Sequence, residues 1–64
     1  MTFGERLRAL RLERRRNQKE LAAAASIDVT YLSKLENSRL EPPAEATIRR
    51  LAAGLEVEPT ELLL

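Results

Sequence analysis

The sequence predicts an all-α fold, a compact bundle of five short helices. Leu, Ala, Arg and Glu, which favour helices, dominate the composition, and the aromatic residues are Phe3 and Tyr31. No stretch alternates apolar and polar residues over the length of a strand, and no repeat or linker divides the chain. We therefore expect residues 1–64 to form a single small domain, with a free energy of unfolding of a few kcal/mol.

The first helix is expected to begin after Thr2, whose hydroxyl can cap the first turn. Phe3, Leu7 and Leu10 follow at the spacing of one helix face, which predicts that this face meets the core. The helix then runs into three consecutive arginines at 14–16. We expect this cluster to be a solvated helix end, with a second DNA-binding site as the alternative.

The second and third helices each start at a capping residue. Asn17 and Glu20 have the spacing of a capping box at the start of the second helix. Asp28 can cap the third, and Ile27 and Leu32 occupy the two positions of a hydrophobic staple around it. The residues expected to be buried in these two helices are Leu21, Ala22, Ala25, Ile27, Leu32 and Leu35.

Prolines separate the third helix from the last two. Pro42 and Pro43 prevent a helix that continues through residues 37–43. A fourth helix is expected over roughly residues 44–55, and a short fifth one has Pro59 at its first position, where proline is tolerated. The inner face of the fourth helix is expected to carry Ile48, Leu51, Ala52 and Leu55, and Val57 and Leu62 are spaced as a second staple.

The outer face of the third helix has an unusual composition. It consists of Val29, Thr30, Ser33, Lys34 and Asn37. A helix that only faces solvent would usually carry Glu and Lys pairs, whereas short donors and acceptors suit base edges in the DNA major groove. Val29 and the Thr30 methyl can contact a thymine methyl, and Lys34 can reach guanine or phosphate. The alternative is a solvated face.

The net charge of +1 conceals a strong asymmetry along the chain. Residues 1–16 hold six Arg against two Glu, residues 17–40 are balanced, and residues 41–64 hold two Arg against five Glu. A basic first segment and an acidic last one suggest a molecule with one end suited to a polyanion. The alternative is that these are ordinary solvated charges on the surface of a small helical protein.

Several classes of function have little support in the sequence. The chain has no Cys and no His, so disulfides, the usual zinc and haem ligands, and His- or thiol-based catalysis are missing. No apolar run is long enough for a membrane span, and no leader pattern marks a signal peptide. We expect no catalytic residues, no cofactor, no metal, no membrane association and no small-molecule ligand.

Ordered motifs over about 60 residues resemble the Cro/repressor-type helix-turn-helix family, also named for the xenobiotic-response-element regulators. The matching runs are 3–8 (FGERLR), 18–22 (QKELA), 31–37 (YLSKLEN), 50–52 (RLA) and 57–63 (VEPTELL). The resemblance implies a lambda-repressor-like five-helix bundle with a helix-turn-helix unit at about residues 18–37. It also implies binding to duplex DNA, generally as a homodimer on a pseudo-palindromic operator.

The resemblance also implies roles for individual residues. Val29, Thr30, Ser33 and Lys34 match positions that face bases. Gln18 would contact the DNA backbone from the start of the second helix, and Asn37, Ser38 and Arg39 would contact phosphate from the following loop. Tyr31 and Glu36 match positions that more often support the fold.

Four positions depart from the family pattern. Ser26 replaces the usual Gly of the turn, where a positive φ is often needed, and Glu56 replaces a Gly at the end of the fourth helix. Arg16 replaces an apolar residue, so the first staple is lost and only the Arg stem can substitute for it. Ala44 replaces a Ser, which removes a helix cap.

The chain ends in three leucines that cannot all face one core. One of Leu62, Leu63 and Leu64 is expected to pack on Val57, and at least one stays exposed unless a partner covers it. We hypothesise a two-fold dimer through this segment; the alternative is the frayed end of a domain cut from a longer chain.

The favoured interpretation is a sequence-specific DNA-binding transcriptional regulator that represses by occupying an operator as a dimer. It would act in the cytoplasm of a bacterial or phage-type system, at the nucleoid when bound to DNA. The alternative is a protein-interaction module on the same scaffold, such as an antitoxin or anti-repressor partner. The acidic last third of the chain and its Leu-rich end support this alternative.

Overall fold

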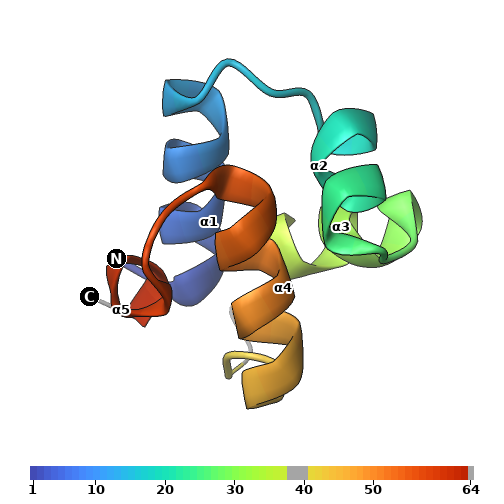
Figure 1. Ribbon diagram of the computed structural model, residues 1–64. Coiled ribbons are helices and arrows are strands. Elements are labelled where there is room, and N and C mark those ends of the chain that lie inside the picture. The colour runs from blue at the N-terminus through green and yellow to red at the C-terminus, as the bar shows by residue number, and fades with distance from the viewer. Residues whose placement is uncertain (38–40, 64) are drawn as a thin grey trace.

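The computed structural model describes residues 1–37 and 41–63, which form five helices and no strand (Figure 1). The helices are α1 (Phe3–Glu13), α2 (Gln18–Ala25), α3 (Val29–Asn37), α4 (Glu45–Leu55) and α5 (Pro59–Leu63). The all-α, five-helix prediction is confirmed. The expected boundaries are confirmed to within a residue. Asn37 is the last residue of α3, where its place on the outer face predicted it, rather than in the following loop that the resemblance implies.

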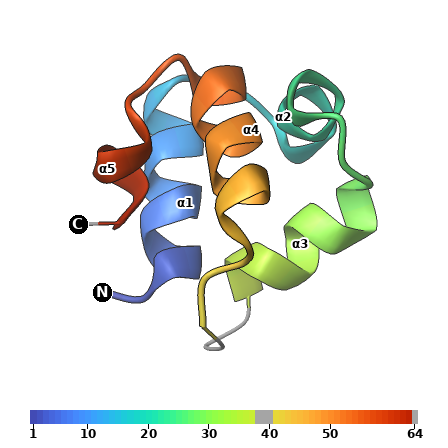
Figure 2. The ribbon, with the colours of Figure 1, turned by 60° about the horizontal axis from the view of Figure 1, so that its bottom comes forward.

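The five helices enclose one apolar core. α4 lies in the middle and packs most extensively on α2, while α1 packs on α3 and on α5 (Figure 2). The largest fully buried side chains are six leucines: Leu7, Leu21, Leu32, Leu51, Leu55 and Leu62. Every helix contributes at least one of them, so the buried stripes read from the sequence meet at a single centre.

Capping boxes define the starts of α1 and α2. At α1, the Glu5 backbone N–H donates to Thr2 Oγ1 at 3.1 Å, and the Thr2 N–H donates to Glu5 Oε1 at 2.8 Å. At α2, Asn17 and Glu20 exchange the same two bonds at 2.7 and 2.9 Å. These contacts satisfy N–H groups that have no partner within the helix, and they confirm both predicted starts.

The start of α3 is held by Asp28 and by a hydrophobic staple. The Asp28 carboxylate accepts a hydrogen bond from the Thr30 backbone N–H at 2.7 Å. Ile27 is half-buried and packs against the core cluster to which the fully buried Leu32 belongs, as expected for a staple. By contrast, Ala44 makes no side-chain cap at the start of α4, which confirms the expected loss of a cap there.

Three residues other than glycine have a positive φ: Arg15 (57°), Ser26 (57°) and Glu56 (60°), among the residues that the structure describes. Ser26 ends α2 and Glu56 ends α4 in the left-handed conformation. This is the conformation that Gly adopts most easily, and the family usually has Gly at both positions. A side chain in this conformation costs about 1–2 kcal/mol because its Cβ crowds the following carbonyl oxygen.

Replacing Ser26 with Gly is expected to raise the free energy of unfolding by about 1 kcal/mol, because glycine adopts this backbone without the Cβ penalty. Urea denaturation followed by circular dichroism measures the change. Ala23→Gly, at an exposed position inside α2, is the matched control and should instead lower the stability by about 1 kcal/mol. Equal effects of the two substitutions would contradict the strain assigned to Ser26.

Candidate nucleic-acid interface

The second and third helices form a two-helix unit that the rest of the chain supports from behind. α2 and α3 pack on each other, and residues 26–28 connect them. α4 holds α2, and α1 holds α3. This arrangement spans residues 18–37, the extent expected for a helix-turn-helix unit, and it leaves the outer side of α3 uncovered.

The predicted base-facing residues lie at the surface of α3. Val29 is 42% exposed, Thr30 and Lys34 are exposed, and Ser33 is half-buried. Thr30, Ser33, Lys34 and Asn37 recur at helical spacing, so they share one side of α3, opposite the buried Leu32 and Glu36. Tyr31, expected to support the fold, is 41% exposed and so also reaches the surface.

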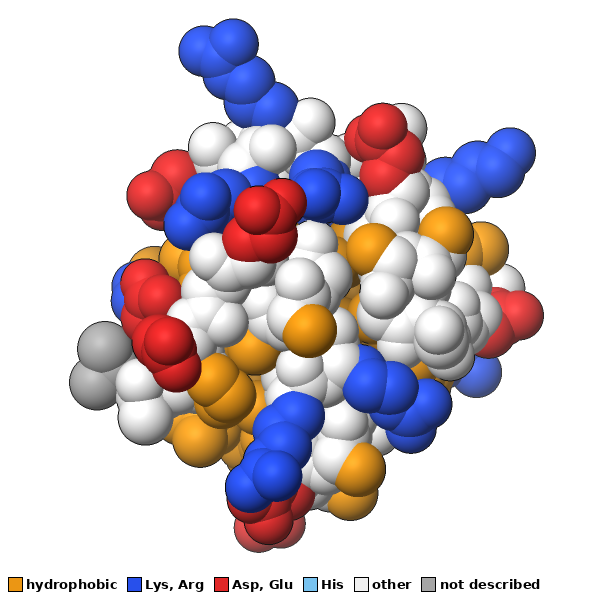
Figure 3. Space-filling model, in the orientation of Figure 1, with side chains coloured by type: hydrophobic (Ala, Val, Ile, Leu, Met, Phe, Trp, Pro, Cys, Tyr) orange, Lys and Arg blue, Asp and Glu red, His pale blue; other side chains and the backbone are white. Residues whose placement is uncertain are grey.

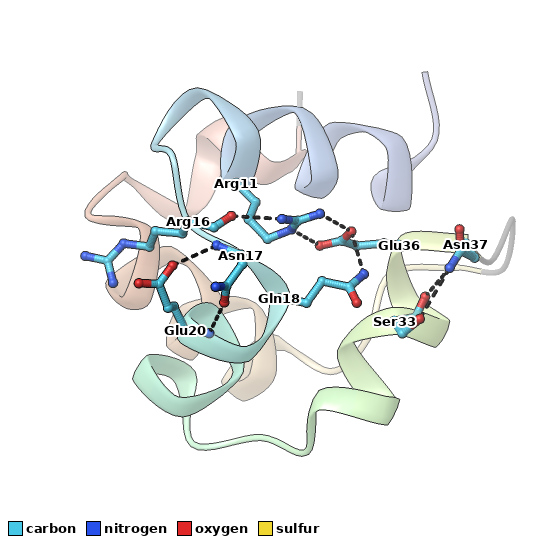
Figure 4. Close-up of polar contacts among 8 residues, drawn as sticks. All are labelled: Arg11, Arg16, Asn17, Gln18, Glu20, Ser33, Glu36 and Asn37. Atoms are coloured by element: carbon cyan, nitrogen blue, oxygen red, sulfur yellow. Dashed lines mark hydrogen bonds and ion pairs between the residues drawn. The ribbon is translucent and has the colours of Figure 1, made fainter.

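Behind this surface lies a buried ion pair that joins α1 to α3 (Figure 4). Arg11 Nε donates to Glu36 Oε2 at 2.6 Å, and Arg11 Nη2 donates to Glu36 Oε1 at 3.0 Å. The two residues are only 7% and 5% exposed. Glu36 thus supports the fold, as expected, whereas Arg11, counted with the basic first segment, is not a surface charge at all.

The position of Arg11 on α1 is the signal that could have revealed its burial. Gly4, Leu7 and Arg11 follow one another at spacings of three and four, so Arg11 continues the buried stripe of α1. Its third bond, from Nη1 to the Arg16 carbonyl oxygen at 2.8 Å, ties the guanidinium to the turn before α2. The planar guanidinium therefore connects three segments with one set of donors.

Gln18 takes part in the same cluster. Its Nε2 donates to Glu36 Oε1 at 3.0 Å, which links the first residue of α2 to the last turn of α3. Gln18 is half-buried, so part of its side chain remains accessible at the start of α2. The first N–H groups of a helix have no intrahelical partner and attract anions, which suits the expected backbone contact at this residue.

The end of α3 differs from what the family resemblance implies, because Asn37 lies in the helix and not in the following loop. Asn37 is the last residue of α3, and its Nδ2 donates to the Ser33 carbonyl oxygen, one turn earlier, at 2.9 Å. Its contact with phosphate stays a prediction, and it would require this amide to change partners. The predicted phosphate contacts of Ser38 and Arg39 lie outside the described residues.

The basic first segment is less available than its charge suggests. Besides the buried Arg11, Arg6 donates from Nε to the Glu61 carbonyl oxygen at 2.7 Å and so fastens α1 to α5. Arg16 forms an ion pair with Glu56 at 3.1 Å, so two departures from the family pattern contact each other. On the face shown in Figure 3, basic side chains are interspersed with acidic ones rather than gathered in one patch.

The C-terminal leucines Leu62 and Leu63 differ in burial, because they lie on different sides of α5. Leu62 is 1% exposed and belongs to the core, as its staple spacing with Val57 predicts, so almost none of its surface is left for the dimer contact that was also predicted for it. Leu63 is 56% exposed and lines a shallow pocket of about 100 Å³ with Met1, Phe3 and Pro42. Leu64 lies outside the described residues.

In residues 1–37 and 41–63 there is no helix with the length and apolarity of a membrane span. The same residues bring together no cluster of three or more potential metal ligands.

Comparison with known proteins agrees with this geometry. The helix-turn-helix domain family model matches residues 2–64. The HTH-type transcriptional repressor RghR of Bacillus subtilis is 39% identical over 88% of this chain and 42% of its own length. The HTH-type transcriptional regulator DdrOP3 of Deinococcus deserti is 44% identical over 98% of this chain and 48% of its own length.

A solved structure is similar as well. The crystal structure of the restriction-modification controller protein C.AhdI from Aeromonas hydrophila superposes with a TM-score of 0.87 at 35% identity, covering 94% of this chain and 89% of that one. The chain spans less than half the length of the two curated relatives. On the family match over residues 2–64, the chain belongs to the helix-turn-helix domain family.

Proposed function

We propose that the protein is a transcriptional regulator that binds duplex DNA in a sequence-specific manner and represses by occupying its operator. The observation that carries the proposal is the exposed side of α3, where short polar side chains and one Lys stand on a helix supported from behind by α1 and α2. An α-helix fits the major groove, and side chains of this size reach base edges there.

Direct contacts to bases are assigned to Val29, Thr30, Ser33 and Lys34. Thr30 and Lys34 are exposed and one turn apart, so they can address neighbouring base pairs. The start of α2, with Gln18, supplies a contact to the DNA backbone that sets the position of α3. Arg39 and Ser38, carried over from the family resemblance, would add contacts to phosphate.

The named relatives support a regulatory role. RghR is named a transcriptional repressor, DdrOP3 a transcriptional regulator, and C.AhdI a controller protein. A protein that occupies an operator blocks polymerase without a cofactor, a metal or a catalytic residue. This role places the protein in the cytoplasm, at the nucleoid when bound to DNA.

Thr30→Ala and Lys34→Ala are each expected to weaken binding to the best site by about 1–3 kcal/mol and to relax base preference at one position. Selection of bound sites from random duplex DNA, followed by a salt series on the selected site, measures both effects. Arg50→Ala is the control because it removes an exposed positive charge from α4 instead of α3. It should leave base preference unchanged, since charge away from the bases acts on all sequences alike.

Unchanged base preference in both α3 variants would reject α3 as the recognition helix. Binding that vanishes at physiological salt, even on the best selected sequence, would favour the alternative of a protein-interaction module on this scaffold.

We also propose that the protein acts as a homodimer through the surface around Leu63. Met1 is 85% exposed and Leu63 56% exposed, and both line the same pocket between α1 and α5, so a second copy would cover apolar surface there. Sedimentation equilibrium at micromolar concentration is expected to show a dimer, and Leu63→Glu to show a monomer that keeps its helical circular dichroism. A single 7.2 kDa species for the unmodified protein would contradict the dimer.

A further inference from the structure

The last two turns of α3 hold a hydrogen-bonded pair of polar side chains, Ser33 and Asn37. Asn37 Nδ2 donates to the Ser33 carbonyl oxygen at 2.9 Å and lies 3.4 Å from Ser33 Oγ, to which it also donates (Figure 4). Asn37 is exposed and Ser33 half-buried, so the pair lies at the surface of α3 rather than in the core.

This contact determines the direction in which the hydrogen of the Ser33 hydroxyl points, and so whether the hydroxyl presents a donor or an acceptor to the outside. A serine hydroxyl has one hydrogen to donate and two lone pairs that accept, and it rotates to suit its neighbours. An amide N–H that points at Oγ occupies a lone pair and repels the hydroxyl hydrogen, which therefore points away from Asn37. No acceptor for that hydrogen occurs among the hydrogen bonds of the described residues. The hydroxyl is thus free to donate outward.

We propose that Asn37 is a positioning residue for specificity, which presents the Ser33 hydroxyl to DNA as a hydrogen-bond donor. The base opposite Ser33 must then offer an acceptor in the major groove: N7 or O6 of guanine, N7 of adenine or O4 of thymine. Cytosine is disfavoured because its edge there presents the N4 amino donor. The inference rests on the proposed function and assigns to Asn37 a role other than a phosphate contact.

The nearly isosteric substitution Asn37→Asp reverses the polarity. A carboxylate has no N–H to donate, so it loses the bond to the Ser33 carbonyl oxygen and turns away from that oxygen toward Ser33 Oγ. The Ser33 hydroxyl then donates to it and turns its lone pairs outward. At the base opposite Ser33, the ratio of affinities for guanine and cytosine should shift toward cytosine by about fivefold, the factor that corresponds to one hydrogen bond of typical net strength. Asn37→Ala frees the hydroxyl to rotate, so it should only reduce the preference for guanine over cytosine and not shift it toward cytosine.

The test uses selected sites in which this one base pair is varied. Ser33→Ala first identifies the position, as the one where base preference is lost. The added negative charge of Asn37→Asp lowers the affinity for every sequence alike, so the ratio of affinities, rather than the affinity itself, is the readout. Circular dichroism checks that each variant is folded, which is expected because Asn37 is exposed.

The double variant Ser33→Ala with Asn37→Asp separates an action through Ser33 from a direct action of the new carboxylate. The proposal requires that the shift toward cytosine disappears in this variant. A shift that persists without the hydroxyl, or an Asn37→Asp preference equal to that of the unmodified protein, overturns it. The proposed function fails on a different result, namely unchanged preference in Thr30→Ala and Lys34→Ala.

Discussion

Replacing Glu36 with Ala is expected to lower the free energy of unfolding by about 3–5 kcal/mol, the cost of breaking a buried ion pair by removing one partner. The Arg11 guanidinium would stay in the interior with two of its donors unmatched, and Gln18 Nε2 would lose its acceptor too. A domain of this size has only a few kcal/mol to lose, so much of the protein should be unfolded at room temperature. Urea and thermal denaturation followed by circular dichroism measure the loss.

Glu45→Ala is the matched control, because it also removes a glutamate from an ion pair with arginine. The Glu45–Arg49 pair joins residues one turn apart on α4, and its side chains are 77% and 70% exposed. Such a pair contributes about 0.3–0.5 kcal/mol, since water screens both charges. If Glu36→Ala costs no more than Glu45→Ala, the Arg11–Glu36 pair does not hold α1 to α3.

A double variant separates the cost of leaving a charge unpaired from the cost of losing packing. Combining Glu36→Leu with Arg11→Met removes both charges and keeps apolar volume in their place, and such exchanges are often neutral or stabilising. We expect the double variant to recover most of the stability that Glu36→Ala loses. A double variant as unstable as the single one would show that the cost comes from packing alone.

Gly4→Ala is expected to lower the stability by about 2 kcal/mol, although alanine is the better helix former by about 1 kcal/mol. A Cβ at Gly4 would lie 2.9 Å from the Glu36 carbonyl oxygen and still closer to that of Leu35. Both are backbone atoms, so α1 and α3 would have to move apart, which would also strain the Arg11–Glu36 pair. Denaturation curves and the salt-dependent affinity for DNA would both record this displacement.

Gly54→Ala is the matched control inside α4, because it brings the same gain in helix propensity. Its Cβ would meet Leu21 Cδ1 at 3.1 Å and Ala24 Cβ at 3.3 Å, which are side-chain atoms. The Leu21 side chain can adjust by a few tenths of an ångström, so the loss should be clearly smaller than at Gly4. Equal losses at the two glycines would contradict the backbone approach between α1 and α3.

The features that the sequence predicted well depend on residues close to one another in the chain. Caps and staples join residues three to five apart, and the buried stripes follow from the helical period, so both can be read without knowledge of the packing. The positive φ that the family pattern indicates at Ser26 is present, and Glu56, which stands where the family has Gly, has one as well. The exposed side of α3 is the complement of its buried stripe, so the candidate interface follows from the same helical period.

The features that the sequence did not predict depend on contacts between helices. Arg11 and Glu36 are 25 residues apart, and nothing local distinguishes Arg11 from its solvated neighbours except its place on the buried stripe. For Leu62 the sequence indicated both a staple with Val57 and a dimer interface, and the packing of α5 places it in the core.

By itself, then, the sequence determined the five helices, their caps, the residues that enter the core and the polar side of α3, because these follow from interactions within one or two turns. Only the tertiary structure decided which charge is buried and at which glycine a Cβ would meet backbone atoms of another helix. Those properties arise where α1 meets α3, since a guanidinium needs a carboxylate, and a close backbone approach needs a missing Cβ, on a different helix.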